Sequence, residues 1–148
     1  MKIYLDNVDE NHKDTLFRLL EYSLFEESLY DGNEMNNNGL FNYDNFDDYF
    51  ANENRKAFFI KGEGTNKLLG FVMINNHSIE EFMVIPKYRR NKIGKQAAFS
   101  CFDMYKGTWK VSPSIGSSQA YDFWNNIITE YTNNNYKFID ESFTFNNQ

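Results

Sequence analysis

Two periods of apolar residues alternate along the chain, and they predict where its strands and helices lie. Short runs of aromatic and branched residues, bounded by Gly, Asn or Pro, are typical of strands. Such runs cover residues 3–5, 57–61, 67–74, 79–85, 109–111, 137–139 and 143–145. Apolar residues three or four positions apart are typical of helices. We expect helices over residues 11–29 and 93–105, another beginning near Ser117, and a short one over residues 46–52.

The helix that begins near Ser117 has the clearest amphipathic pattern. Its apolar residues form one stripe along the helix: Ala120, Phe123, Trp124, Ile127, Ile128 and Tyr131. A stripe of this kind packs against the core through one face. Ser117 or Ser118 is expected to cap the helix, because a serine hydroxyl accepts a hydrogen bond from the first turn. The 93–105 segment is apolar on nearly all sides, so we expect it to be deeply packed.

The order of these elements predicts one mixed α/β domain over residues 1–148. Between residues 57 and 85 three strands follow one another with short turns, which favours antiparallel hairpins. Strands alternate with helices only in the second half of the chain. A chain of 148 residues, 41% of them hydrophobic, can bury a core of its own. Residues 31–45 are rich in Asn and Gly and are expected to form a loop.

Composition narrows the classes of function. The chain has 15 basic and 21 acidic residues, so its formal net charge is -6, and its pI is near 4.9. An acidic body argues against general binding of nucleic acids. No apolar leader segment and no membrane-length apolar run is evident, so we expect a cytoplasmic protein that does not bind membranes.

The cysteine and histidine residues do not form a pattern typical of a catalytic thiol or a metal site. The single cysteine, Cys101, lies in an apolar helical pattern and is expected to be a buried thiol rather than a nucleophile. His12 and His77 are far apart, and neither has the Cys/His spacing of metal ligands nearby. We therefore predict no metal site and no disulfide.

The most informative segment is the basic loop, residues 87–95. It holds five of the 15 basic residues, and no acid occurs from residue 86 to residue 102. An apolar strand precedes this loop and an apolar helix follows it. A loop in that place directs backbone N–H groups and the positive end of a helix at one spot. This arrangement suits a phosphorylated ligand, although a solvated surface loop is the simpler alternative.

The same segment resembles the acyl-coenzyme-A site of the GNAT superfamily of N-acetyltransferases. The family signature is Gln/Arg-x-x-Gly-x-Gly/Ala, and here it reads Arg-Arg-Asn-Lys-Ile-Gly over residues 89–94. Gly94 supplies the second glycine, whereas Lys92 stands in place of the first. The likeness continues through residues 102–111, Ala120 to Trp124, Glu130 to Thr132 and Tyr136, as in small bacterial stand-alone members. In all it covers roughly residues 67–136.

The resemblance implies a GNAT-like α/β fold, in which helices flank a mixed, mostly antiparallel central sheet. It implies transfer of an acetyl group from acetyl-CoA, the co-substrate, to a primary amine, with both reactants bound together. Met83, Val84 and Ile85 would lie along the pantetheine arm, with an N–H near Val84 holding the thioester oxygen. The pyrophosphate would be wrapped by Arg89, Arg90, Asn91, Lys92, Ile93, Gly94 and Lys95.

Two further positions follow from the resemblance. Ser117 stands where many members have an Asn that contacts the cofactor. Trp124 stands where members commonly have a Tyr that protonates the leaving thiolate, and an indole cannot act as that acid. Water could protonate the thiolate instead, or it could leave unprotonated, because a thiol pKa is about 8.5.

The acceptor amine must lose a proton, and a carboxylate near the thioester is the natural base. Glu80 and Glu81 lie directly before Phe82 in the 79–85 strand. Neighbouring residues in a strand direct their side chains to opposite faces of the sheet, so only one of the two can face the cleft. We favour Glu81 because it lies nearer the expected reaction centre. Glu80 is the alternative, and two purely structural carboxylates are a further possibility.

The acceptor itself is expected to be cationic. Between Arg18 and Arg55 there is no basic residue, but there are nine acids: Glu21, Glu26, Glu27, Asp31, Glu34, Asp44, Asp47, Asp48 and Glu53. In this family the first helices border the acceptor cleft, and an acidic rim attracts an amine. A solvated helix face is the alternative interpretation.

Two rival functions remain open at this point. One is a catalytically silent acyl-CoA-binding sensor, suggested by Trp124. The other is a phosphate- or RNA-binding module, which the acidic body disfavours. The expected partner is a small-molecule or peptide amine, without nucleic acid or membrane, and the protein is expected to be a monomer or a homodimer.

Overall fold

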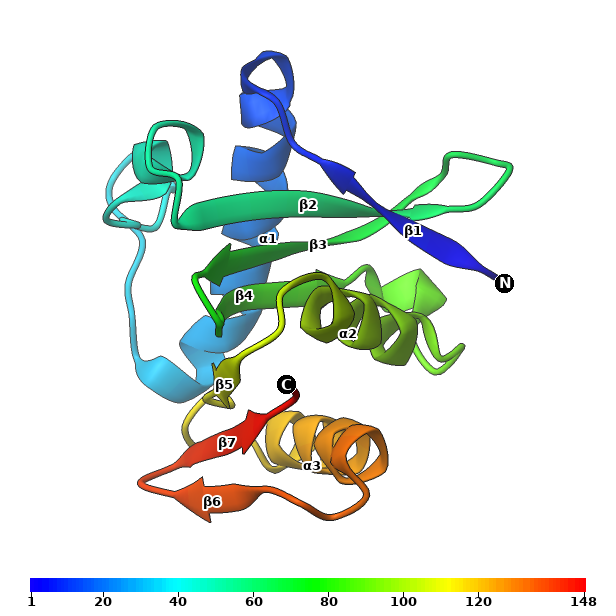
Figure 1. Ribbon diagram of the computed structural model, residues 1–148. Coiled ribbons are helices and arrows are strands. Elements are labelled where there is room, and N and C mark those ends of the chain that lie inside the picture. The colour runs from blue at the N-terminus through cyan, green and yellow to red at the C-terminus, as the bar shows by residue number, and fades with distance from the viewer.

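A seven-stranded sheet with helices on both faces forms the molecule in the computed structural model, which describes residues 1–148 (Figure 1). The strands are β1 (Ile3–Asn7), β2 (Arg55–Gly62), β3 (Leu68–Asn75), β4 (Ser78–Val84), β5 (Thr108–Val111), β6 (Lys137–Ile139) and β7 (Ser142–Asn146). The α-helices are α1 (Lys13–Asp31), α2 (Ile93–Met104) and α3 (Ser118–Thr132). Short 3-10 helices are η1 (Glu10–His12), η2 (Phe46–Phe50) and η3 (Pro86–Tyr88).

The sheet has the order β1-β2-β3-β4-β5-β7-β6, and only β4 and β5 run parallel. This confirms the mixed, mostly antiparallel sheet predicted from the sequence. Each predicted strand and helix is present, with its ends moved by at most two residues. The short helix over residues 46–50 is a 3-10 helix. No helix is long and apolar enough to cross a lipid bilayer.

The central strands are covered on both faces by separate apolar cores. One core, of 19 buried residues, joins the sheet to α2 and α3. The other, of 12 buried residues, joins the sheet to α1 and to the segment that holds Phe41 and Tyr49. Figure 1 shows α1 crossing behind the central strands, while α2 lies on the near side. Cys101 belongs to the first core, and burial raises the pKa of its thiol to about 12, as expected for an unreactive cysteine.

Strands β4 and β5 diverge after a short contact. Only Ser78 and Ile79 of β4 pair with β5, opposite Lys110 and Val111. Strand β5 ends there because Pro113 follows two residues later, and proline has no N–H group for a sheet ladder. The rest of β4 keeps its partner β3 on one edge and has no strand on the other. We call this unpaired edge of β4, beyond Ile79, the opening in the sheet.

A β-bulge in β4 decides which side chains face the opening. Met73 pairs with Glu81 and the next residue, Ile74, pairs with Ile79, so Glu80 has no partner across the ladder. The extra residue reverses the alternation of side chains. Ile79 and Phe82 therefore pack on the same core, between the sheet and α2 and α3. Glu81 lies on the opposite face, which is covered by α1.

Gly70 allows β3 and β4 to approach closely at the open end of the sheet. It pairs with Val84, and a Cβ atom at residue 70 would lie 2.1 Å from the carbonyl oxygen of Met83. That oxygen belongs to the backbone, so it cannot move aside like the end of a flexible side chain. A glycine is therefore required beside Val84.

We predict that Gly70→Ala lowers the free energy of unfolding by at least about 2 kcal/mol, because the added methyl group displaces the β4 backbone. Urea unfolding followed by circular dichroism measures this loss. If the Gly70→Ala protein is as stable as the parent, β3 and β4 are further apart than described here.

Candidate active site

The open edge of β4 offers unpaired backbone groups to a ligand. The N–H of Ile85 donates to the carbonyl of Leu69 on β3, at 2.8 Å. Because backbone groups alternate along a strand, those of Val84 and Phe82 point away from β3, toward the opening. The carbonyl of Val84 accepts a hydrogen bond from Nε of Arg89, at 2.7 Å. The N–H of Val84 therefore faces the opening without a strand partner.

The three strand residues predicted for the pantetheine arm are thus not equivalent. Only Val84 has its backbone directed to the opening. Met83 pairs with Phe71, and Ile85 is bonded to Leu69, so both direct their backbone groups to β3. The sequence shows that backbone groups alternate in direction along the strand. It does not show whether the odd- or the even-numbered residues direct theirs to the opening, because that depends on the register with the partner strand.

The loop between β4 and α2 has the backbone shape of an anion-binding nest. Arg90 has φ +67° and Lys92 has φ +62°, both in the left-handed region, with Asn91 between them. Alternating conformations of this kind turn successive N–H groups toward one point. Helix α2 begins directly afterwards, and its first N–H groups have no partner within the helix. Lys92 therefore adopts the conformation that the family's first glycine adopts easily.

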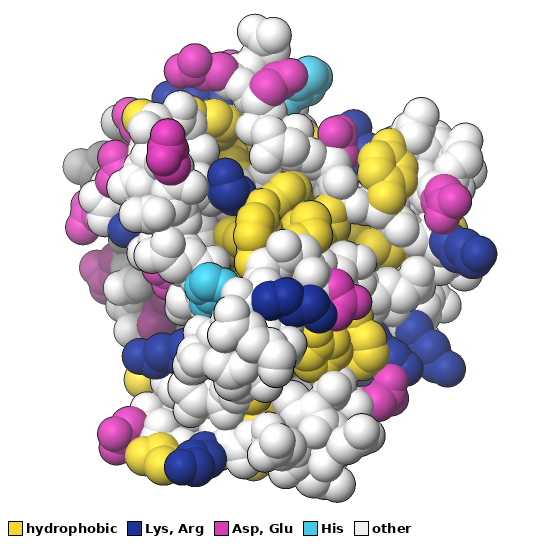
Figure 2. All heavy atoms as spheres, viewed as in Figure 1, with side chains coloured by type: hydrophobic (Ala, Val, Ile, Leu, Met, Phe, Trp, Pro, Cys, Tyr) yellow, Lys and Arg dark blue, Asp and Glu magenta, His cyan; other side chains and the backbone are white.

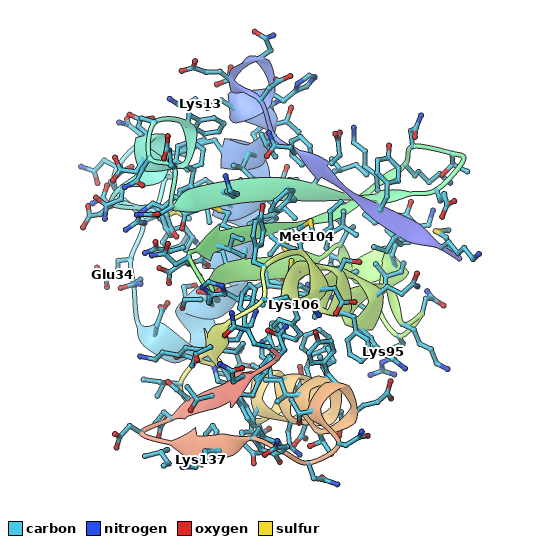
Figure 3. All side chains as sticks on the ribbon, viewed as in Figure 1. Lys13, Glu34, Lys95, Met104, Lys106 and Lys137 are labelled. Carbon is cyan, nitrogen blue, oxygen red and sulfur yellow. The ribbon has the colours of Figure 1, made fainter.

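The basic side chains of this loop divide into engaged and free groups. Arg89 pairs with Glu26 of α1 at 2.8 Å. Lys95 pairs with Glu130 of α3 at 2.5 Å, and Figure 3 shows it between α2 and α3. Arg90 and Lys92 form no ion pair, so their charges are available to a phosphate.

Gly94 is needed for packing inside the protein. A Cβ atom there would lie 2.7 Å from Cζ of Phe123 and 3.6 Å from Val84. From the sequence, Gly94 was expected only to be the second glycine of the signature, around the pyrophosphate. The helix contact was missed because Phe123 lies 29 residues later, and only the fold brings it to α2.

Trp124 packs in an aromatic cluster beside the opening. Its ring centroid lies 5.0 Å from that of Phe82 on β4 and 5.0 Å from that of Phe123. The indole is 7% exposed, and its N–H makes no hydrogen bond within the protein. Ser117 caps α3, since its hydroxyl accepts from the N–H of Ala120 at 3.1 Å. Of the two predicted caps, Ser117 is the one used.

Glu81 lies in a cluster of carboxyl and phenol groups under α1. Burial, followed by the nearby Glu27, raises the pKa of Glu81 to about 8, while the Tyr43 hydroxyl acts in the opposite direction. Burial and Asp31 likewise raise the pKa of Glu27. Glu80 is exposed and accepts a hydrogen bond from Asn75 at 3.4 Å. The structure thus separates the two carboxyls that the sequence left as alternatives.

Glu27 and Tyr43 are site residues that the sequence analysis did not assign. Glu27 was one of nine acids in a charge pattern, and Tyr43 lies in the Asn-rich loop. The only sequence feature that could have indicated a role was their position. Glu27 belongs to the predicted first helix, and Tyr43 is an aromatic residue within a run of polar residues. Neither feature shows that they meet Glu81, because both contacts span long stretches of chain.

The nine acids do not form a single rim. Asp47 pairs with Lys13 at 2.6 Å, and Glu21 accepts from the N–H of Phe41 at 2.8 Å. Glu34 projects from the loop after α1 (Figure 3). Figure 2 shows acidic side chains spread over the left and upper edge of the molecule, around the segment between α1 and β2.

We predict that Lys92→Gly raises the free energy of unfolding by about 0.5–1 kcal/mol. The left-handed conformation costs a residue with a Cβ about 1–2 kcal/mol, and the greater freedom of glycine in the unfolded chain offsets part of that gain. Urea unfolding measures the change. Lys87→Gly, in the neighbouring 3-10 helix, is the control and should not stabilise. A destabilised Lys92→Gly protein contradicts the described nest.

Comparison with known proteins identifies the family. The model of the acetyltransferase (GNAT) family matches residues 22–111. No curated protein sequence matches the chain significantly. Among solved structures, a GNAT acetyltransferase from Staphylococcus aureus Mu50 is similar, with 14% identity, a TM-score of 0.59, and coverage of 98% of this chain and 99% of that one.

Two other similar structures contain coenzyme A. The putative N-acetyltransferase YhhK from Escherichia coli, bound to coenzyme A, has 12% identity and a TM-score of 0.59, with 99% and 100% of the chains covered. Spermidine N-acetyltransferase from Vibrio cholerae, with CoA and spermine, has 9% identity and a TM-score of 0.63, with 97% and 95% covered. At such identities these likenesses concern the fold, whereas the family model also matches the sequence from α1 to β5. The chain belongs to the acetyltransferase (GNAT) family and is an N-acetyltransferase with acetyl-CoA as its co-substrate.

Proposed function

We propose that the protein acetylates a cationic primary amine by direct transfer from acetyl-CoA, with Glu81 as the base. One observation carries this proposal: a partly buried carboxyl with a pKa raised to about 8 lies on the strand whose open edge suits a thioester. A general base is most effective when its pKa is near the working pH. Exposed Glu80 has no comparable environment.

The cofactor is proposed to enter the opening beside β4. The N–H of Val84 would hold the thioester oxygen, with Met83 and Ile85 as its neighbours on the strand. The nest and the first turn of α2 would bind the pyrophosphate through the N–H groups of residues 90–95. Ser117 and Trp124, at and near the start of α3, would border the pantetheine arm. The unpaired charges of Arg90 and Lys92 support this placement.

The transfer step needs no covalent intermediate on the enzyme. The amine nitrogen attacks the thioester carbonyl carbon, and the oxygen gains negative charge opposite the Val84 N–H. The carbon–sulfur bond then breaks, and the CoA thiolate leaves with the electron pair. Glu81 takes the proton from the amine, directly or through a water. Water protonates the thiolate, since a thiol pKa of about 8.5 makes it a good leaving group.

The acidic cluster favours a positively charged acceptor. Beside burial, the charge of Glu27 raises the pKa of Glu81 and the charge of Asp31 raises the pKa of Glu27, because negative charges repel one another in a partly buried site. A bound ammonium group would relieve this repulsion and lower the pKa of Glu81. A lysine-like amine has a pKa of about 10.4, so it would arrive charged and leave its proton with the carboxylate.

A catalytically silent acyl-CoA sensor is the second candidate. The observation that favours it is Trp124, whose indole N–H donates hydrogen bonds but is not acidic enough to replace the family's tyrosine acid. CoA-thiol release over a panel of mono-, di- and polyamines, beside a calorimetric titration with CoA, separates the two functions. Binding without thiol release from any amine supports the sensor.

We predict that Glu81→Gln lowers kcat/KM for the amine about 10²- to 10⁴-fold, the usual range for loss of a general base. In the parent protein kcat/KM should rise with pH through about 8, as Glu81 loses its proton. In the variant the rate should recover partly at high pH, where the amine is neutral. Glu80→Gln is the matched control and should be mild. If Glu80→Gln is the crippling change, the base is misassigned.

Glu81→Gln also has a readout that does not depend on turnover. The folded protein holds a proton on Glu81 up to a pKa of about 8, whereas the unfolded chain releases it near the ordinary value of 4.5. Since the folded state binds more protons in that window, the free energy of unfolding falls as the pH rises from about 4.5 to 8. Glu81→Gln should flatten this fall. An unchanged slope argues that Glu81 is not buried.

We predict that Trp124→Phe keeps most of the turnover, because the indole serves packing against Phe82 and Phe123. Trp124→Tyr should raise kcat if a phenol can protonate the thiolate at that place. Steady-state kinetics with circular dichroism as a folding check test both. A loss of several orders of magnitude in a folded Trp124→Phe protein would show that the indole N–H has a chemical role.

A further inference from the structure

Arg89 joins three elements at the mouth of the opening. Its Nη1 and Nη2 donate to the two carboxylate oxygens of Glu26 on α1, at 3.1 and 2.8 Å. Its Nε donates to the carbonyl of Val84 at the end of β4, at 2.7 Å. Its own backbone begins the nest that precedes α2. The side chain therefore spans from the helix on one face of the sheet to the open edge of β4.

This geometry uses the guanidinium as a fork. A bidentate pair with a carboxylate fixes the plane of the guanidinium, and this also fixes the direction of the Nε–H group. That direction meets the carbonyl of Val84. A lysine in the same place could hold one partner or the other, but it could not hold both in a fixed plane.

The ion pair between Arg89 and Glu26 contributes little to the stability of the fold. The side chains of Arg89 and Glu26 are 41% and 47% exposed, and ion pairs at such exposure contribute little to folding. The bond to Val84, in contrast, restrains the residue whose N–H faces the opening. The pair is therefore better explained by what it positions.

We infer that Glu26 is a positioning residue of the acetyl-CoA site, acting through Arg89 on the backbone of Val84. This inference rests on the proposed function, in which the Val84 N–H holds the thioester oxygen. Glu26 keeps the guanidinium on the Val84 carbonyl, so that β4 and the start of the nest stay in register with each other. Arg89 then serves the reacting end of the donor, whereas Arg90 and Lys92 serve its phosphates.

The competing role for Arg89 is a direct contact with phosphate, and two acetyl donors separate the roles. Acetyl-CoA carries phosphates and S-acetylpantetheine does not, although both present the same thioester. We expect Glu26→Ala to lower kcat/KM about tenfold with both donors, because a misplaced backbone donor acts on the thioester in either case. Glu26→Gln, which keeps one acceptor oxygen, should give an intermediate loss.

A double-mutant cycle tests whether Glu26 acts through Arg89. Arg89→Gln keeps a donor for the Val84 carbonyl but removes the pair with Glu26. Adding Glu26→Ala to Arg89→Gln should therefore cause no further loss. Asp6→Ala, which breaks the pair of Asp6 with Lys61 at the β1 edge of the sheet, is the control and should leave the kinetics with both donors unchanged.

Three results would overturn the inference: a loss with acetyl-CoA that disappears with S-acetylpantetheine, fully additive effects in the cycle, or unchanged kinetics in Glu26→Ala. Calorimetric titration of the same variants with acetyl-CoA and with S-acetylpantetheine, in the absence of an amine, gives a readout without turnover. There Glu26→Ala should weaken both ligands by a similar factor. If the parent acetylates no amine, the proposed function fails, and equal losses in the titrations still support the positioning role.

Discussion

The unpaired edge of β4 is the constraint on which the site depends. A strand inside a sheet normally satisfies its N–H and C=O groups on both edges, because buried groups without partners are costly. Here β5 stops after pairing with Ser78 and Ile79, so the remaining groups on that edge need another partner. An extended ligand arm can supply one. In the proposed function, the short strand that ends before Pro113 therefore leaves open the edge to which the donor binds.

The bulge at Glu80 lets one strand present groups to both of the proposed substrates. Without it, Glu81 would share the face of Ile79 and enter the apolar core under α2 and α3. With it, Phe82 packs on that core and Glu81 moves to the face of α1, beside Glu27. The proposed thioester contact and the proposed base thus lie three residues apart on one rigid strand: the N–H of Val84 points out from the open edge, and the side chain of Glu81 lies on the face covered by α1. A base on a mobile loop would not be held so firmly relative to Val84.

Sequence reasoning predicted the elements well, because their signals are local. Apolar periodicity located every strand and every α-helix, the serine before α3 is its cap, and charge density located the loop before α2. The contacts that organise the site are not local. Arg89 and Glu26 are 63 residues apart, and no pattern at either position names the other. The bulge was also missed, since the sequence of β4 shows alternation but not the register with β3.

The charges of the loop show why a basic cluster is a poor guide to individual roles. From the sequence, its arginines and lysines looked interchangeable as phosphate ligands. In the structure Arg89 is tied to α1 and β4, Lys95 is tied to α3, and Arg90 and Lys92 stay unpaired in left-handed conformations. The backbone strain falls on two of the three basic residues of the loop without an ion pair, since Lys87 is also unpaired but lies in a 3-10 helix. Strain of this kind persists only where the surroundings enforce it, and here helix α2 and the Arg89 contacts hold both ends of the loop. The loop is thus shaped in advance for an anion, and phosphate binding need not reorganise it.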